Sequence, residues 1–235
     1  MIFYKIIKTI IVGRIVKITQ GESNMESQFD SKLKFEKLRS NIYDELNYYI
    51  KNEYYDNSDK PALIKINNFT NNILTNMENW IHDEIPEEYK KNIFKYIDEK
   101  KWDKLIEAFK QKLTFGTSGV RGKLIVSLDN NDSEKDLLSL NKFGFNSNIL
   151  RGPNSINEIT ITKNIIGLIN YMKKNSMSKI IIGYDSRTLS KLYTILISNL
   201  FIKNNISVIL FEEPNTLPEL SFAVTYFKAD LGIEI

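Results

Sequence analysis

The chain has 235 residues, of which 42% are hydrophobic and 26% charged, an ordinary globular composition with length for one large or two small domains. It contains no cysteine, which excludes disulfides, thiolate catalysis and Cys-ligated zinc and favours a reducing compartment, here expected to be the cytoplasm. A single histidine, His82, argues against Ser-His-Asp sites and multi-His metal sites.

The net charge of +3 comes entirely from residues 1–24, which hold four basic residues and one acidic residue. The rest of the chain carries 28 charged residues of each sign and is neutral. The basic balance therefore does not indicate a nucleic-acid surface, and we expect no nucleic-acid partner.

Residues 1–18 are apolar but interrupted by basic side chains. Their longest uncharged run, residues 9–13, is far shorter than the ~20 residues of a membrane span, and no unbroken apolar region of a secretory signal is present. We expect no membrane association, although a basic amphipathic surface helix is an alternative. The plainest hypothesis is that residues 1–24 are disordered, or absent from a native protein that starts at Met25.

Residues 25–112 are predicted to form an all-helical extension. Apolar residues recur every three to five positions from Met25 to Tyr55, which predicts a helix. They are Phe29, Leu33, Leu38, Ile42, Leu46 and Tyr49. After a break at 59–61, helices are predicted over 67–81, 87–98 and 101–111.

The large apolar residues of this extension are interpreted as core. They are Trp80, Ile93, Phe94, Ile97, Trp102, Leu105, Ile106 and Phe109. The function of residues 25–79 stays open between a module that binds a protein partner and simple packing.

From residue 113 onward the sequence predicts an α/β domain. Lys123 to Leu128 is typical of a strand. The polar, acidic and Asn-rich stretch 129–148 that follows is predicted to be a disordered insertion, with a lid as the alternative.

After Asn157, helices and strands alternate. The expected elements are a helix from Asn157 to Asn175, a strand over 179–184, a helix capped by Ser190, a strand over 206–211, a helix opened by Pro218 and a strand over 232–235. The predicted inward residues are Ile161, Ile165, Leu168, Ile169 and Met172 in the first helix and Leu192, Ile195, Leu196 and Leu200 in the second. This order predicts a mainly parallel sheet flanked by helices, with ligands at the carboxyl ends of its strands.

The segment Phe115–Gly122 has the sequence FGTSGVRG, and no other eight residues of the chain are so rich in groups that bind anions. Its glycines let successive backbone N–H groups converge on one anion, and Thr117 and Ser118 add hydroxyl donors. Arg121 adds a planar fork of donors that matches a phosphate edge. The alternative is a glycine-rich turn with a surface arginine.

A second candidate, Asp185-Ser186-Arg187, follows the strand predicted over 179–184. In the structural interpretation Asp185 accepts hydrogen bonds from nearby backbone N–H groups and pairs with Arg187. In the functional interpretation this loop faces the same cleft as Thr117 and Ser118. The turn over 213–218 is interpreted as structural.

Five segments in this order and spacing resemble the N-terminal part of the α-D-phosphohexomutases, in particular their phosphoglucomutase/phosphopentomutase-like branch. They are 115–122, 151–157, 180–187, 218–224 and 229–235, and the resemblance runs from about Trp80 to Ile235. It implies an α/β/α first domain preceded by a short helical lead-in. The stretch 129–148 departs from the family pattern, because it adds about two dozen residues between two of the motifs.

Members of this family transfer a phosphoryl group within a sugar phosphate by way of a phosphoserine, with Mg²⁺ as cofactor and a sugar bisphosphate as activator. The resemblance implies that Arg121, Thr117, Ser118 and Gly119 bind the substrate phosphate and that Asp185 and Arg187 support this site. It implies no catalytic residue and no metal ligand in this chain, because the family's phosphoserine and metal loops match no residue up to Ile235. We therefore expect the 235 residues alone to be inactive and to bind no cofactor.

Three hypotheses follow. The chain is the N-terminal part of a phosphoglucomutase-like enzyme that interconverts hexose 1-phosphate and hexose 6-phosphate, or of a phosphopentomutase acting on ribose phosphates. Alternatively, it is a non-catalytic module that binds sugar phosphates, or an interaction protein built on its helical extension.

Overall fold

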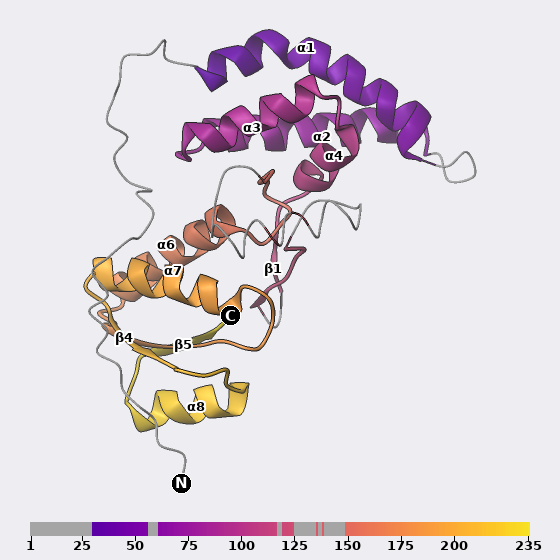
Figure 1. The fold of residues 1–235 in the computed structure, drawn as a ribbon. Coiled ribbons are helices and arrows are strands. Elements are labelled where there is room, and N and C mark those ends of the chain that lie inside the picture. Colours follow the sequence, from indigo (N-terminus) through magenta and orange to yellow (C-terminus); the bar gives the residue numbers. More distant parts are fainter. Residues whose placement is uncertain (1–29, 56–60, 117–118, 125–134, 136–137, 139–148) are drawn as a thin grey trace. The chain divides into compact units, whose positions relative to one another are not determined.

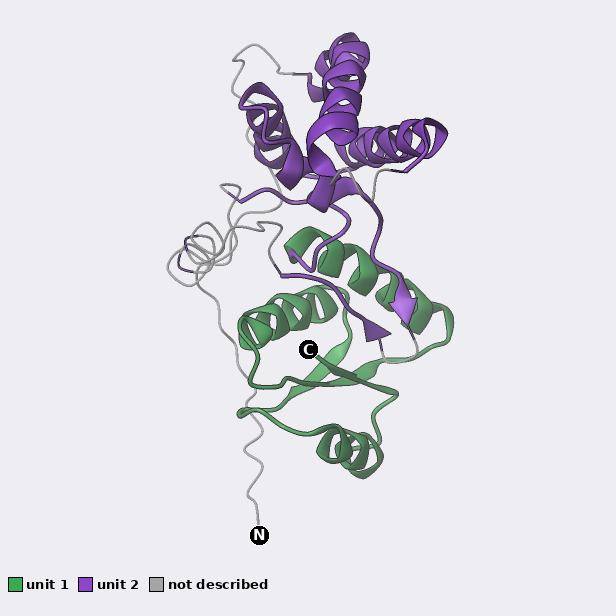
Figure 2. Ribbon diagram, turned by 90° about the vertical axis from the view of Figure 1, so that its right-hand side faces the viewer, with its two compact units in different colours: residues 1–15, 158–235 green, residues 16–157 purple. Residues whose placement is uncertain are grey.

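The computed structural model describes residues 30–55, 61–116, 119–124, 135, 138 and 149–235. The described chain divides into two compact units, an N-terminal unit that ends at Asn157 and a C-terminal unit that begins at Glu158 (Figure 2). Residues 1–24, and nearly all of 129–148, lie outside the described residues. The predictions made for them, and the predicted domain boundary at residue 113, stay predictions.

The N-terminal unit begins with α1 (Ser31–Tyr49), which continues into the π-helical turn η1 (Ile50–Tyr54). Asp30 caps α1, since its side chain accepts hydrogen bonds from the backbone N–H groups of Lys32 at 3.0 Å and Leu33 at 3.2 Å. The helix predicted from the apolar pattern is confirmed over these residues, although Leu33, one of the apolar residues of that pattern, is 47% exposed. Leu33 lies about half a turn around the helix from buried Ile42, whereas Phe35 shares the face of Ile42 and is fully buried.

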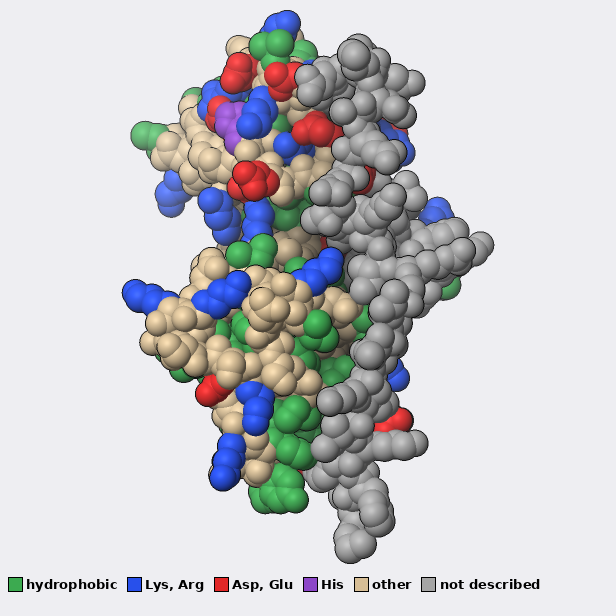
Figure 3. All heavy atoms as spheres, turned by 90° about the vertical axis from the view of Figure 1, so that its left-hand side faces the viewer, with side chains coloured by type: hydrophobic (Ala, Val, Ile, Leu, Met, Phe, Trp, Pro, Cys, Tyr) green, Lys and Arg blue, Asp and Glu red, His purple; other side chains and the backbone are tan. Residues whose placement is uncertain are grey.

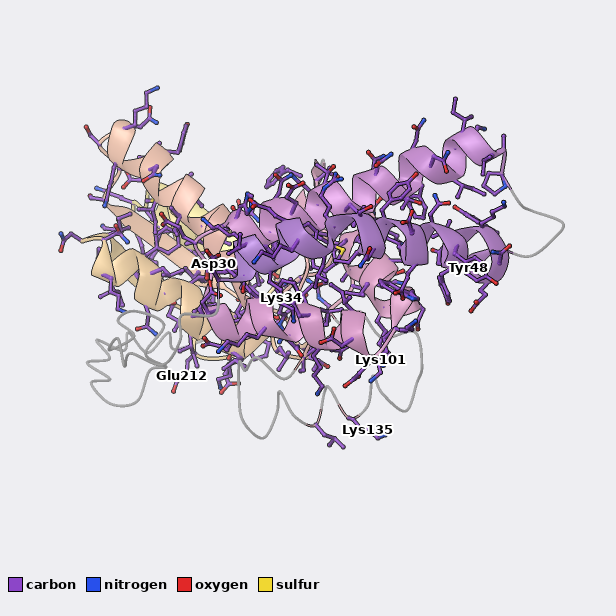
Figure 4. All side chains as sticks on the ribbon, turned by 90° about the horizontal axis from the view of Figure 1, so that it is seen from above. Asp30, Lys34, Tyr48, Lys101, Lys135 and Glu212 are labelled. Atoms are coloured by element: carbon purple, nitrogen blue, oxygen red, sulfur yellow. The ribbon has the colours of Figure 1, made fainter. Side chains whose placement is uncertain are left out.

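The next three helices confirm the sequence prediction. They are α2 (Leu63–His82), α3 (Glu87–Asp98) and α4 (Trp102–Phe109), and all eight residues predicted as core are buried in them. The Trp80 and Phe109 rings meet edge to face with centroids 6.5 Å apart. Lys34 of α1, which Figure 4 labels, lies over the Phe94 ring, 4.5 Å from its centroid. The helices thus bury a core of their own.

A short hairpin follows α4 in the same unit. Its strands, β1 (Phe115–Gly116) and β2 (Gly119–Val120), pair antiparallel. Of the strand predicted over Lys123 to Leu128, only the first two residues are described, and Lys123 forms an isolated parallel bridge with Ser155.

The C-terminal unit is an α/β/α sandwich, which confirms the predicted fold class. Its elements are α6 (Glu158–Lys174), β3 (Lys179–Gly183), α7 (Ser190–Lys203), β4 (Ser207–Leu210), α8 (Leu217–Tyr226) and β5 (Leu231–Glu234). The strands are parallel in the order β4-β3-β5, with α6 and α7 over one face and α8 over the other (Figure 1).

Alternation along β3 explains the two layers of helices. Ile180 and Ile182 point to one side of the sheet and pack in a cluster with α6 and α7, while Ile181 points to the other side and packs against Leu220 and Ala223 of α8. In α6, the predicted inward residues Ile165, Ile169 and Met172 are buried and Ile161 and Leu168 pack against the same cluster, as expected.

The inward face predicted for α7 is shifted by one residue. The buried apolar residues are Tyr193, Ile197 and Phe201. Of the predicted residues, Leu200 packs against the core cluster but Ile195 is 48% exposed. This helix is apolar around most of its circumference, so apolar spacing alone cannot select the side that meets the sheet. Within the described residues, no helix is long and apolar enough to cross a membrane.

Candidate functional site

The hairpin β1–β2 carries the glycine-rich segment. Phe115 pairs with Val120 and Gly116 with Gly119, while Thr117 and Ser118, the two residues between them in the sequence, lie outside the described residues. Gly119 has a φ of +101°, a conformation that side chains with a Cβ rarely adopt, although a Cβ here would meet nothing within 4 Å. Backbone geometry, rather than space, therefore requires glycine at this position.

Arg121 leaves the hairpin directly after β2 and is exposed. Two residues later the chain is anchored, because the backbone carbonyl of Lys123 accepts a hydrogen bond from the N–H of Ile156 at 2.8 Å. The side-chain Nζ of Lys123 lies 2.8 Å from Oε1 of Glu107 in α4. The exit of the glycine-rich segment is thus tied both to α4 and to the segment around Ser155.

Glu107 is a buried carboxylate that the sequence analysis did not single out. Its side chain is 5% exposed, and Lys110 donates to Oε2 at 2.8 Å while Lys123 lies at the other oxygen. Burial raises the pKa of Glu107, but the hydrogen bonds from Lys110 and Lys123 outweigh burial and hold the pKa below its usual value. A glutamate inside an amphipathic helix gives no sequence signal of this kind, because its second lysine comes from a distant segment.

The second motif, 151–157, packs against the end of α4. Asn154 donates its Nδ2 to the Glu107 carbonyl at 2.7 Å and its N–H to the Ala108 carbonyl at 3.2 Å, which satisfies two carbonyls of the last helical turn. The N–H of Leu113 donates to the Pro153 carbonyl at 2.9 Å. The structure therefore brings the flanks of the first two sequence motifs together at the end of α4.

In the C-terminal unit, Asp185 follows the carboxyl end of β3, as predicted. Arg187 donates its N–H to Oδ1 at 2.9 Å and its Nε to Oδ2 at 2.6 Å, and Ser190 donates its hydroxyl to Oδ1 at 3.0 Å. The predicted structural interpretation of this turn is confirmed. A role of Asp185 and Arg187 beside a ligand stays a prediction.

The hydrogen bonds to Asp185 affect its pKa and involve the first residue of α7. Burial raises the pKa of Asp185, but the hydrogen bonds from the Arg187 backbone and from the Arg187 and Ser190 side chains hold it below its usual value. The prediction that Ser190 caps α7 is wrong: Ser190 lies inside the helix, and Leu189, with a φ of 68°, takes the N-cap position. The Ser190 hydroxyl is used by Asp185 instead.

Two further polar residues at this sheet edge were missed by the sequence analysis. Asn215 accepts a hydrogen bond from the Tyr184 N–H at 3.0 Å and places its Nδ2 3.5 Å from Oε2 of Glu234, at the end of β5. Burial, followed by the charge of Asp185, raises the pKa of Glu234. Glu234 is the last residue of β5, and Asn215 lies in the turn between β4 and α8; a position near the carboxyl end of a strand is the sequence signal that could have found them.

The turn over 213–218 is structural, as expected. Thr216 and Glu219 form a capping box at the start of α8, and the Tyr184 hydroxyl donates to the Glu212 carbonyl at 2.8 Å. Across the part of the chain that the structure describes, no group of three or more His, Cys, Asp or Glu side chains could hold a metal ion.

Comparison with known proteins assigns the C-terminal part of the chain. Residues 141–235 match the family model described as phosphoglucomutase/phosphomannomutase, alpha/beta/alpha domain I. A phosphoglucomutase of Staphylococcus aureus (strain USA300) is 35% identical over 130 residues, and one of Staphylococcus haemolyticus (strain JCSC1435) is 32% identical over the same length. Each match covers 55% of this chain and 19% of the relative, and no solved structure matched the chain.

The spacing of the sequence motifs, the parallel sheet between α6, α7 and α8, and these matches agree with one another. Residues 141–235 are thus similar, in sequence and in fold, to domain I of the phosphoglucomutase/phosphomannomutase family.

Proposed function

We propose that this chain is the N-terminal part of a phosphoglucomutase-type enzyme that interconverts hexose 1-phosphate and hexose 6-phosphate. The observation that carries the proposal is the match of residues 141–235 to domain I, supported by relatives named phosphoglucomutase. The chain spans about a fifth of the length of those relatives, so the activity of the complete protein is part of the proposal. The absence of cysteine is consistent with a reaction in the cytoplasm.

In this proposal the glycine-rich segment contributes a phosphate-binding loop. Gly119 adopts a backbone conformation reserved for glycine, and the exposed Arg121 follows it on an anchored stretch of chain. An arginine held in this way offers paired N–H donors to phosphate oxygens and stabilises their charge while the phosphoryl group is transferred. Thr117, Ser118 and Gly119 are proposed to complete the loop with hydroxyl and backbone donors.

Mg²⁺ and a sugar bisphosphate activator belong to the proposal for the complete enzyme. The described residues do not fit a magnesium site, since Asp185 is engaged by Arg187 and Ser190 and no third carboxylate joins Asp185 and Glu234.

The direct test is calorimetric titration of the chain with glucose 1-phosphate and glucose 6-phosphate, with ribose 5-phosphate to separate hexose from pentose preference. Replacement of Arg121 by alanine should weaken sugar-phosphate binding about 10- to 100-fold, the loss of charge-assisted hydrogen bonds worth ~1.5–3 kcal/mol. Unphosphorylated glucose should not bind to either protein.

The matched control is Arg39→Ala, which also removes one arginine but from a surface ion pair between α1 and α2, 3.5 Å from Glu78. This variant should bind like the unaltered chain. Equal binding by the Arg121→Ala variant would contradict the proposed role of Arg121. A stable helical fragment that captures a protein partner, without any sugar-phosphate binding by the chain, would favour the interaction-protein alternative.

A further inference from the structure

Glu107 forms ion pairs with two lysines that belong to different segments of the chain. Lys110 lies one turn further along the same helix, α4, and reaches Oε2 at 2.8 Å. Lys123 lies at the exit of the glycine-rich loop and reaches Oε1 at the same distance. One carboxylate thus joins α4 to the loop, while its pair with Lys110 stays within the helix.

Because Glu107 is buried, its carboxylate oxygens depend on hydrogen bonds from protein donors. A carboxylate that is 5% exposed has lost most of its water, so its remaining lone pairs must be satisfied by protein donors. Lys110 donates to Oε2 of Glu107, which leaves Oε1 to be satisfied by Lys123. Oε1 of Glu107 in α4 therefore needs a hydrogen-bond donor, and Lys123 at the loop exit supplies it.

The loop exit is held at its main chain as well. Lys123 accepts a hydrogen bond from Ile156, and Asn154 binds the carbonyl of Glu107 itself at 2.7 Å. Glu107 consequently lies where α4, the loop exit and the segment 151–157 meet. Arg121 is two residues from the anchored lysine, which limits how far its backbone can move.

We propose that Glu107 is a positioning residue that, through Lys123, holds the loop exit so that Arg121 stays in place for a sugar phosphate. This inference rests on the proposed function, because it presumes that Arg121 meets a phosphate group. Glu107 itself is not proposed to touch the ligand.

The test compares three single variants of the full chain. Glu107→Gln removes the charge of the link and leaves one acceptor oxygen for two lysines, and Lys123→Met removes the donor on the loop. Lys110→Met removes the other lysine of the same carboxylate and leaves the loop link intact. Hydrogen–deuterium exchange of the peptide spanning residues 115–124 reports loop order without any ligand, and calorimetry with glucose 6-phosphate reports binding.

We expect Glu107→Gln and Lys123→Met to speed exchange in this peptide and to weaken binding about tenfold, on the order of one charge-assisted hydrogen bond. The double variant should be no weaker than either single variant, because both remove the same link. Lys123→Arg keeps a charged donor and should bind glucose 6-phosphate like the unaltered chain. Lys110→Met should leave exchange and affinity unchanged, even if it lowers the melting temperature.

Normal exchange in Glu107→Gln and Lys123→Met would overturn the inference, as would fast exchange with unchanged affinity. A Lys110→Met variant as weak as Lys123→Met would show that Glu107 acts only through the general stability of α4, which also overturns it. If the unaltered chain binds no glucose 6-phosphate, the proposed function fails, and this inference fails with it.

Discussion

Gly152 lies so close to α4 that no larger residue fits. A Cβ at this position would lie 2.4 Å from the backbone carbonyl oxygen of Ala108 and 2.9 Å from its carbonyl carbon, and a helix backbone cannot move aside cheaply. The segment that binds the end of α4 through Asn154 therefore depends on this glycine.

We expect Gly152→Ala to lower the free energy of unfolding by about 2 kcal/mol, the typical cost of overpacking. Urea unfolding followed by tryptophan fluorescence measures the change. Gly116→Ala is the control in the same unit, since its Cβ would make an ordinary contact of 3.5 Å with Gly119. Equal losses in both variants would mean that the contact with Ala108 is not the cause.

Glu234 gives a pH-dependent prediction. Its pKa in the folded protein is raised by burial and then by the charge of Asp185, so folding favours the protonated carboxyl group. The carboxylate therefore lowers stability above the folded-state pKa, and this effect disappears as the pH falls below the unfolded-state pKa.

Glu234→Gln mimics the protonated form and keeps an oxygen for Asn215. It should raise the melting temperature at neutral pH, and the gain should shrink to nothing near pH ~3, where glutamate is protonated in both states. Thermal unfolding across this range measures it. A gain that is constant with pH would rule out ionisation of Glu234 as the source.

At the scale of elements, α8 depends on its capping box. Thr216 Oγ1 accepts from the Glu219 N–H at 3.5 Å, and Glu219 Oε2 accepts from the Thr216 N–H at 2.8 Å. Thr216→Ala should cost about 1 kcal/mol in urea unfolding followed by circular dichroism. Thr225→Ala, an exposed position near the other end of α8, should leave stability nearly unchanged; a similar loss there would mean that the cap is not responsible.

The sequence predicted elements better than it predicted their faces. α3 was predicted with its observed bounds because Pro86 and two glutamates mark its start, and β3 was predicted from a run of β-branched residues between polar ends. The face of α7 could not be predicted, because an almost wholly apolar helix is oriented by the sheet that it covers. The turn η1 was missed because the apolar spacing continues through it.

The candidate site shows the same limit. Asp185 and its pairing with Arg187 were predictable, since the two residues are neighbours after a strand. Glu107 and Asn215 were not, because each acts on a residue far away in the sequence and only the tertiary structure shows the contact.

At the scale of the whole molecule, both tryptophans belong to the N-terminal unit. Trp80 and Trp102 are buried in the helical core, whereas the C-terminal unit has its own core on both faces of the sheet. Tryptophan fluorescence therefore reports the helical unit alone, while circular dichroism reports both units.

We expect two separate transitions in urea, with the fluorescence change matching only one of them. Ile181→Ala, which opens a cavity between the sheet and α8, should shift the dichroism transition that fluorescence does not report and leave the fluorescence midpoint in place. A single coincident transition, shifted by this substitution in both signals, would show that the two units unfold as one.

The contact between Gly183 and Asn215 has a consequence for how this sequence can change. A Cβ on residue 183 would lie 2.4 Å from Oδ1 of Asn215, the atom that accepts the hydrogen bond from Tyr184. A side chain at position 183 therefore either displaces the Asn215 amide or requires a smaller residue at position 215, and either change gives up the hydrogen bond that joins the end of β3 to the turn before α8. A substitution at position 183 is therefore expected to disturb the contact made by Asn215, although 31 residues separate the two partners of that hydrogen bond.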